Sequence, residues 1–341
     1  MKIMTRTLSL LAAAAVLLPQ LAGAAQKSIY GDDDRLDYFE ASPAMRSLAD
    51  SVVSLWPSKQ VTLENGEYKL RTIGFGDALN LCPGEKFREQ PIGAFCSGTL
   101  VGDDIIMTAG HCITDDKSCA DARFVFGYNI DSDGGAARTS VPAKDVYTCK
   151  RIIKRDLDRQ ADGLVNTGIV IIGALLGKQP GPDYALVQLD RKVEGRRPLA
   201  VDRSNDLKVG DRIFVIGHPV GLPVKVAGNA SVRNTEPKAF FLTDLDTFGG
   251  NSGSAVFNAR TRKIEGILVR GGTDFVDTAA GCKAQLKIGQ NEGKGEAVTK
   301  ISVLRKYIPE TGAARSFGDS VGIRVDEVPP ASEELAAKIA F

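Results

Sequence analysis

The sequence predicts an all-β fold made of two halves of similar size. Short runs of β-branched and aromatic residues recur at short intervals, separated by glycine, proline and asparagine, which is typical of a β-sandwich or a β-barrel. The chain has 341 residues, enough for one large or two medium domains. A basic stretch that ends in proline, at 191–198, is the expected linker between the halves.

The expected strands are short and apolar in both halves. In the first half, the turn Gly102-Asp103-Asp104 separates two apolar runs and therefore predicts a hairpin. The predicted strands of this half are 51–56, 95–101, 105–109, 124–128, 146–153, 169–175 and 185–189. Those of the second half are 212–216, 225–232, 239–243, 254–257 and 263–269. Helical spacing over 298–308, ended by Pro309, predicts a C-terminal helix, and a shorter helix is expected at 333–339.

The N-terminus has the pattern of a signal peptide, residues 1–24. Lys2 and Arg6 precede an apolar core, 8–18, which is too short to span a bilayer, and Ala22-Gly23-Ala24 supplies the small residues of a cleavage site. The alternative is an uncleaved membrane anchor. We therefore expect a secreted or periplasmic protein with no membrane span in its mature form.

The remaining chain divides into four expected segments. Residues 25–50 are acidic and polar and are interpreted as a leader or pro-segment rather than as core. The two β halves occupy 51–195 and 196–310, and 311–341 is a loop-like tail.

Charge and composition exclude several functions. The chain carries 43 basic and 42 acidic residues without a basic run, so we expect no nucleic-acid partner. Its only histidines are His111 and His218, which argues against a histidine-rich metal site. Six cysteines without paired CxxC units favour three disulfides over zinc, and the count alone leaves their pairing open. We expect neither a metal nor a cofactor.

One glycine-rich turn has the composition of a catalytic site. It runs Phe248-Gly249-Gly250-Asn251-Ser252-Gly253-Ser254 and places a serine between glycines. Glycine permits a positive φ, so two backbone N–H groups can point to one place beside the Ser252 hydroxyl. Such a pair stabilises the oxyanion of acyl transfer. A glycine hairpin with an ordinary serine is the alternative.

Two further residues complete a set for nucleophilic catalysis. His111 ends the apolar strand 105–109, and Asp183 opens the strand 183–189. Serine needs a base to take its proton, and a buried carboxylate orients that base. Asp162 and Asp190 are weaker candidates for the carboxylate, and His218, in a turn, is interpreted as structural.

Together these motifs identify a resemblance to the chymotrypsin-like serine peptidases, and within them to the bacterial glutamyl-endopeptidase-like (V8-like) branch. The matching stretches are Thr-Ala-Gly-His-Cys at 108–112, Asp-Tyr-Ala-Leu-Val-Gln-Leu at 183–189, Gly-His-Pro at 217–219 and Gly-Gly-Asn-Ser-Gly-Ser at 249–254. The resemblance covers about residues 50 to 310. It implies a trypsin-like fold of two six-stranded antiparallel β-barrels.

The resemblance also implies roles for individual residues. His111 would be the general base, Asp183 its orienting carboxylate and Ser252 the nucleophile, with the N–H groups of Gly250 and Ser252 as the oxyanion hole. It further implies a disulfide between Cys96 and Cys112 around the histidine. For the other cysteines we expect the pairs Cys119–Cys149 and Cys82–Cys282.

Specificity is less well defined by the sequence. Asp246 occupies the position at which trypsin-like enzymes carry the carboxylate that binds a basic P1 side chain; a turn carboxylate that faces solvent or pairs with Arg270 is equally compatible with the pattern. The stretch Val269-Arg270-Gly271 resembles the segment that pairs with substrate backbone. The family's activation aspartate is replaced by Asn251, which makes activation by an N-terminal ion pair doubtful.

The sequence therefore predicts an exported serine endopeptidase that acts on protein or peptide substrates, with a basic P1 preference as one option, and as a monomer. The first rival is a catalytically silent homologue that acts as a binding module. The second is an ester or lipid hydrolase on another fold. This chain lacks the G-x-S-x-G turn of that fold, and its order of histidine, aspartate and serine is the reverse of that fold's order.

Overall fold

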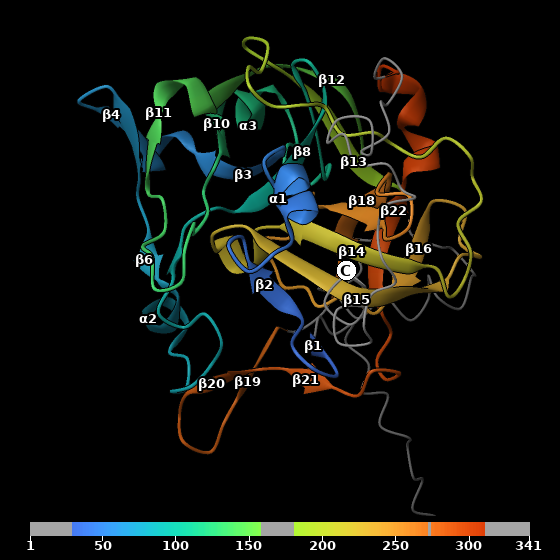
Figure 1. The fold of residues 1–341 in the computed structure, drawn as a ribbon. Coiled ribbons are helices and arrows are strands. Elements are labelled where there is room, and N and C mark those ends of the chain that lie inside the picture. The colour runs from blue at the N-terminus through green and yellow to red at the C-terminus, as the bar shows by residue number, and fades with distance from the viewer. Residues whose placement is uncertain (1–28, 158–180, 272–273, 311–341) are drawn as a thin grey trace, which may run out of the picture.

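The computed structural model describes residues 29–157, 181–271 and 274–310 (Figure 1). The signal peptide, the strand predicted at 169–175, Asp162, the tail 311–341 and its predicted helix lie outside these residues. Among the described residues, no helix is long and apolar enough to cross a membrane.

The first barrel is closed, antiparallel and six-stranded, in the order β10-β12-β13-β9-β8-β3. The alternation of strand and turn in the sequence sets this arrangement, and the predicted hairpin is confirmed as β8 and β9, with Thr99 opposite Met107. Its strands are β3 (Val52–Pro57), β8 (Cys96–Gly102), β9 (Ile105–Thr108), β10 (Ala122–Phe126), β12 (Val146–Leu157) and β13 (Asp183–Leu189).

The second barrel has the order β14-β17-β18-β22-β16-β15 and closes through the pairing of β14 with β15. Its strands are β14 (Arg212–Gly217), β15 (Lys225–Asn234), β16 (Phe240–Thr243), β17 (Ala255–Asn258), β18 (Ile264–Arg270) and β22 (Glu296–Lys300). The prediction of two six-stranded antiparallel barrels is confirmed.

The C-terminal α-helix predicted at 298–308 is not formed. The first three of these residues belong to β22, and the chain then makes two 3₁₀ turns, η4 (Ile301–Val303) and η5 (Arg305–Tyr307). The buried side chains of Val298, Ile301 and Leu304 gave the helical spacing, but Val298 is paired with Phe241 in the sheet.

The N-terminal segment, 29–50, is part of the folded core, so its interpretation as residues outside the core is wrong. It contains β1 (Ile29–Tyr30), β2 (Arg35–Asp37) and α1 (Pro43–Ala49), and α1 is capped by the Ser42 hydroxyl. Strand β2 pairs with β15 at the edge of the second barrel, and β1 pairs in parallel with β21 (Lys287–Ile288). Whether maturation removes any of it stays a prediction.

Several small elements surround the barrels and were not expected from the sequence. They are η1 (Ser58–Gln60), β4 (Val61–Glu64), β5 (Glu67–Leu70), β6 (Ile73–Gly74), α2 (Phe75–Leu79), β7 (Pro91–Ile92), α3 (Asp116–Asp121), β11 (Ser140–Pro142), η2 (Ala143–Asp145), η3 (Pro219–Gly221), β19 (Phe275–Asp277) and β20 (Lys283–Gln285). Elements α2, β19 and β20 lie together at the lower edge of the molecule in Figure 1. Three disulfides hold the structure, and their pairs agree with those expected: Cys82–Cys282, Cys96–Cys112 and Cys119–Cys149.

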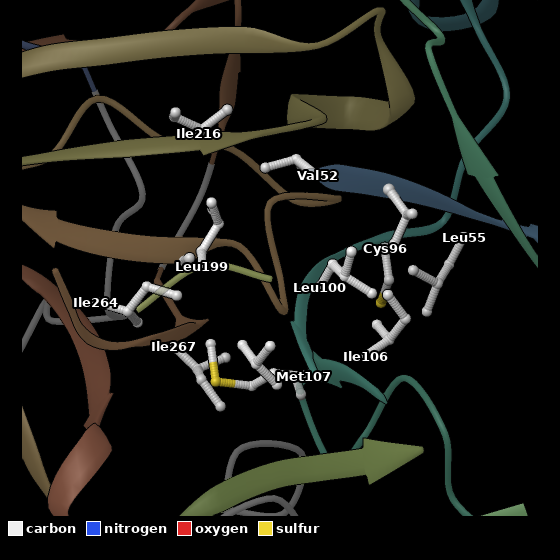
Figure 2. Packing of buried hydrophobic residues seen from close by; sticks show 14 of the residues in the cluster. Val52, Leu55, Cys96, Leu100, Ile106, Met107, Leu199, Ile216, Ile264 and Ile267 are labelled. Carbon is white, nitrogen blue, oxygen red and sulfur yellow. The ribbon is translucent and has the colours of Figure 1, made fainter. Parts of the chain in front are cut away.

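The largest core cluster includes side chains of both barrels and of the segment between them. Figure 2 shows part of it, with Met107 from the first barrel, Ile264 and Ile267 from the second, and Leu199 from the connecting segment. The N–H of Leu199 donates to Leu100 O at 2.8 Å, which fixes the connecting segment to β8. Because this core is continuous, the strands that carry the site residues are packed against each other.

Candidate active site

His111 and Asp183 form a hydrogen-bonded pair. His111 Nδ1 lies 2.7 Å from Asp183 Oδ2, and the His111 backbone N–H donates to Asp183 Oδ1 at 3.1 Å. The Asp183 side chain is 1% exposed and the His111 side chain 35% exposed. A buried carboxylate thus holds His111 by two contacts, one to the ring and one to the backbone, and does not contact the second ring nitrogen, Nε2.

The sequence around the pair explains this geometry. Asp183 is the first residue of β13, and its backbone N–H and C=O both bond to the hydroxyl of Thr299 on β22 of the second barrel. The residue before the histidine is Gly110, and a Cβ there would lie 3.0 Å from Asp183 Oδ1 and 2.9 Å from Tyr184 O. A larger residue would therefore push the histidine and the aspartate apart.

The backbone N–H groups of the turn around Ser252 differ in whether they are bonded within the protein. The N–H groups of Gly249, Asn251 and Gly253 donate to Asp274 Oδ2, Phe248 O and Leu268 O, at 2.8, 3.1 and 2.8 Å. Within the described part of the chain, the N–H groups of Gly250 and Ser252 have no acceptor. These are the two groups that the resemblance assigns to an oxyanion hole.

Residues from other segments fix the carbonyl groups of the same turn. Val220 N–H donates to Gly249 O at 2.5 Å, the Ser97 hydroxyl to Gly250 O at 3.0 Å, and Ser97 N–H to Ser252 O at 2.9 Å. Gly250 has φ 85° and packs against the turn 218–221, since its Cβ would lie 2.8 Å from His218 O. The turn is thus held from both barrels.

The Cys96–Cys112 disulfide lies next to both His111 and Ser252. Cys112 Sγ is 3.7 Å from Ser252 O, and the two sulfur atoms lie within 4.8 Å of a ring nitrogen of His111. Sulfur in a disulfide is not a thiolate, so this group does not form a metal site. In the part of the chain that the structure describes, no hydrogen bond joins Ser252 Oγ to His111; such catalytic contacts are often long in the absence of substrate.

His218 has a different environment from His111. It is 1% exposed, stacks on Tyr128 at 5.9 Å between ring centroids, and its Nδ1 lies 2.9 Å from Leu222 O. Burial lowers the pKa of His218 to about 3, so the imidazole is neutral. Its N–H donates to the Ser97 hydroxyl at 2.9 Å, which connects it to the nucleophile turn through its backbone.

Asp246 is buried and contacts the N-terminal segment. Its Oδ1 accepts the N–H of Tyr30 at 2.8 Å and its Oδ2 that of Asp34 at 3.0 Å. It thus neither faces solvent nor pairs with Arg270. Arg270, at the end of β18, directs both terminal nitrogens to Gly181 O at 3.4 Å, two residues before Asp183. Val269 is buried in β18, and Gly271 follows the strand.

Sequence reasoning missed three residues that support the turn: Ser97, Val220 and Asp274. A serine in a strand and an aspartate in a loop carry no distinctive local pattern. Only the position of Ser97, directly after the expected disulfide cysteine Cys96, could have suggested proximity to the turn.

Comparisons with known proteins place the sequence among the trypsin-like peptidases. The family model of the trypsin-like peptidase domain matches residues 96–267, just over half of the chain. The serine protease PepD of Mycobacterium tuberculosis is 31% identical over 123 residues, covering 31% of this chain and 26% of PepD. A probable periplasmic serine endoprotease DegP-like of Pseudomonas fluorescens is 29% identical over 178 residues, covering 47% of this chain and 37% of the relative. The alignments thus span well under half the length of these curated relatives.

Solved structures with similar folds include a Glu endopeptidase in complex with MPD and the VesB protease of Vibrio cholerae. The first has 17% identity and a TM-score of 0.41, covering 80% of this chain and 93% of that one. The second has 15% identity and a TM-score of 0.46, covering 82% and 66%. By its match to the family model, this chain belongs to the trypsin-like peptidase domain family.

Proposed function

We propose that this protein is an exported serine endopeptidase that hydrolyses peptide bonds through an acyl-enzyme intermediate. The observation that carries the proposal is the pair of N–H groups, of Gly250 and Ser252, that have no acceptor in the described structure, while the N–H groups of their neighbours are all bonded. The buried His111–Asp183 pair supports it, because it supplies an oriented base.

In the proposed mechanism, Ser252 Oγ attacks the carbonyl carbon of the scissile bond and His111 Nε2 takes the hydroxyl proton. Asp183 accepts the Nδ1–H, stays ionised and stabilises the imidazolium. The negative charge that develops on the carbonyl oxygen is met by the N–H groups of Gly250 and Ser252. The C–N bond then breaks as His111 gives the proton to the amine, and water attacks the acyl-enzyme by the same route.

The proposed function does not depend on which P1 residue the enzyme prefers. A basic preference depended on Asp246, but both of its oxygens accept backbone N–H groups of the N-terminal segment, so its contacts do not favour that role. We propose instead that Asp246 fixes the N-terminal segment to the loop that precedes the nucleophile turn. Val269, Arg270 and Gly271 remain the segment proposed to pair with substrate backbone, and membership of the glutamyl-endopeptidase-like branch rests on the sequence motifs alone.

Export and protein substrates are part of the same proposal. Three disulfides are typical of proteins in oxidising compartments, in agreement with a secreted or periplasmic location. We propose that the mature protein is a monomer, as the sequence suggested.

Fluorophosphonate labelling of the purified protein, with peptide mapping and a casein assay, tests the function. We expect the label on Ser252 and loss of both labelling and cleavage in Ser252→Ala, with a rate about 10⁶-fold lower, the size typical of a removed catalytic serine. Ser254→Ala is the matched control because this second serine lies in the same turn, and it should still be labelled.

Two results would contradict the proposal. Casein cleavage retained by Ser252→Ala would exclude this nucleophile. A folded wild-type protein that resists the label both before and after N-terminal trimming would favour the catalytically silent homologue, whereas labelling only after trimming would indicate a zymogen.

A further inference from the structure

We propose that Ser97 is a positioning residue that holds the oxyanion hole in its active conformation; this inference rests on the proposed function. Ser97 is the second residue of β8 in the first barrel, is fully buried, and lies opposite Ser54 of β3. It thus reaches the turn of the second barrel from the first.

The Ser97 hydroxyl joins two parts of the site. It accepts the N–H of His218 at 2.9 Å and donates to Gly250 O at 3.0 Å. A hydroxyl has one proton to donate and lone pairs to accept, so both contacts can form at once. The same side chain therefore fixes the turn 218–221 and the nucleophile turn relative to each other.

The backbone of Ser97 adds a second attachment. Its N–H donates to Ser252 O at 2.9 Å, and its C=O accepts the Thr108 hydroxyl at 2.7 Å. Ser97 consequently holds the peptide groups that follow Gly250 and Ser252. These two groups lie on either side of the peptide that carries the Ser252 N–H.

An external support is needed because the turn is intrinsically free to rotate. Gly249 and Gly250 have no Cβ, and Gly250 already has φ 85°, so little steric resistance opposes rotation of the adjoining peptides. The peptide after Gly250 carries Gly250 O and connects the Gly250 N–H to the peptide of the Ser252 N–H, so its rotation would move these two donors relative to each other. The hydrogen bond from Ser97 Oγ opposes that rotation.

Ser97→Ala tests this role through the separation of kcat from KM on a peptide substrate. We expect kcat and the rate of fluorophosphonate labelling to fall by about tenfold to a hundredfold, less than the loss of an oxyanion donor itself, with KM within about twofold of wild type. Ser97→Thr keeps the hydroxyl and should restore most of the activity. Ser97→Cys, which keeps the volume with a weaker donor, replaces the alanine variant if that variant does not fold.

Ser54→Ala is the matched control. Ser54 is also fully buried, also uses its hydroxyl in two hydrogen bonds, to Val125 O and from Trp56 Nε1, and lies directly across the strand pair from Ser97. Both alanine variants should lose stability, but only Ser97→Ala should lose kcat. Amide hydrogen exchange over 247–254 should increase in Ser97→Ala and stay unchanged in Ser54→Ala.

The outcomes separate this inference from the proposed function. Equal kcat values in Ser97→Ala and Ser54→Ala, from a wild-type protein that reacts with the label, would overturn the role of Ser97 alone. A wild-type protein that does not react would contradict the proposed function, and hydrogen exchange would then decide whether Ser97 orders the turn.

Discussion

Val220 is held in a backbone conformation that a β-branched residue rarely adopts. Its φ is 46° and its ψ 19°, in the left-handed region. This conformation costs a non-glycine residue roughly 1–2 kcal/mol. It directs the Val220 N–H to Gly249 O at 2.5 Å, so the strained residue bonds directly to the nucleophile turn.

We expect glycine to be more stable than alanine at this position. Val220→Gly and Val220→Ala both lose the two methyl groups of valine, but only glycine relieves the left-handed strain, so the free energy of unfolding of the glycine variant should be higher by about 1 kcal/mol. Chemical denaturation of both variants measures this. Val226, in strand β15, is the control: there the alanine variant should be more stable than the glycine variant. If alanine were also the more stable variant at position 220, Val220 would not be strained.

The residues proposed to carry the chemistry could be selected from sequence, but the residues that support them could not. Serine, histidine and aspartate were recognised because each stands in a distinctive local pattern. Ser97 acts through contacts with Gly250 and His218, which are more than a hundred residues away. The interpretation of Asp246 failed to anticipate its partners for the same reason, because Tyr30 and Asp34 come from a segment that was assigned outside the core.

At the scale of elements, the Cys82–Cys282 disulfide joins the loops that support the nucleophile turn. Phe248 stacks on Phe275 at 5.2 Å between ring centroids, and Phe275 contacts Phe75 of α2 edge-on at 6.0 Å. The disulfide links the loop after α2 to the β19–β20 hairpin, and so joins the two segments that carry Phe75 and Phe275. Neither of its cysteines is fully buried.

Removing this disulfide should lower the reactivity of Ser252 as well as the stability of the fold. We expect the Cys82→Ser/Cys282→Ser double variant to lose about 2–5 kcal/mol of stability and to react more slowly with fluorophosphonate, because Phe275 and Asp274 are released from the turn. The double variant Cys119→Ser/Cys149→Ser, which frees α3 from β12, is the control. It should lose comparable stability and keep its labelling rate; equal rates in both would contradict this coupling.

The barrel strands were predictable because apolar runs and turn residues define them locally. The region 298–308 shows where this local prediction fails. Buried residues at a spacing of three occur in a helix, but they also occur in a strand that continues into 3₁₀ turns. The N-terminal segment shows a second failure. Its polar composition indicated solvent exposure, yet Arg35 is fully buried, where its guanidinium bonds to Asp33 and stacks over Phe248 at 4.4 Å.

For the molecule as a whole, buried carboxyl groups make stability depend on pH. Burial raises the pKa of Asp246 to about 7, against the effect of its two N–H donors, and burial together with Asp33 raises the pKa of Asp34 to about 6. Each acid binds its proton more tightly in the folded state, so its stabilising contribution is full below about pH 4 and is lost as the pH rises through the folded pKa. Buried His218 acts in the opposite direction, and its contribution is lost as the pH falls below about 6.5.

Asp246→Asn should remove part of this dependence. Between pH 4 and 7, we expect the free energy of unfolding of the wild type to fall relative to the variant by about 2–4 kcal/mol, because asparagine has no proton to lose. Chemical denaturation across this range measures the difference. Asp133 is exposed and provides the control, so the stability of Asp133→Asn should change with pH as that of the wild type does. If the stability of Asp246→Asn also changed with pH as the wild type does, the raised pKa of Asp246 would be refuted.

The pairing of β2 with β15 has a consequence for how the chain folds during synthesis. Residues 35–37 bond to residues 225–227, so almost two hundred residues must follow the N-terminal strand before its partner exists. The first barrel can close without β2, whereas the pairing of β2 with the second barrel is a contact of very high sequence separation. Strand β1 waits longer still, because its partner β21 lies at 287–288, so β1 and β2 are the strands of the nascent chain most in need of protection from aggregation and proteolysis.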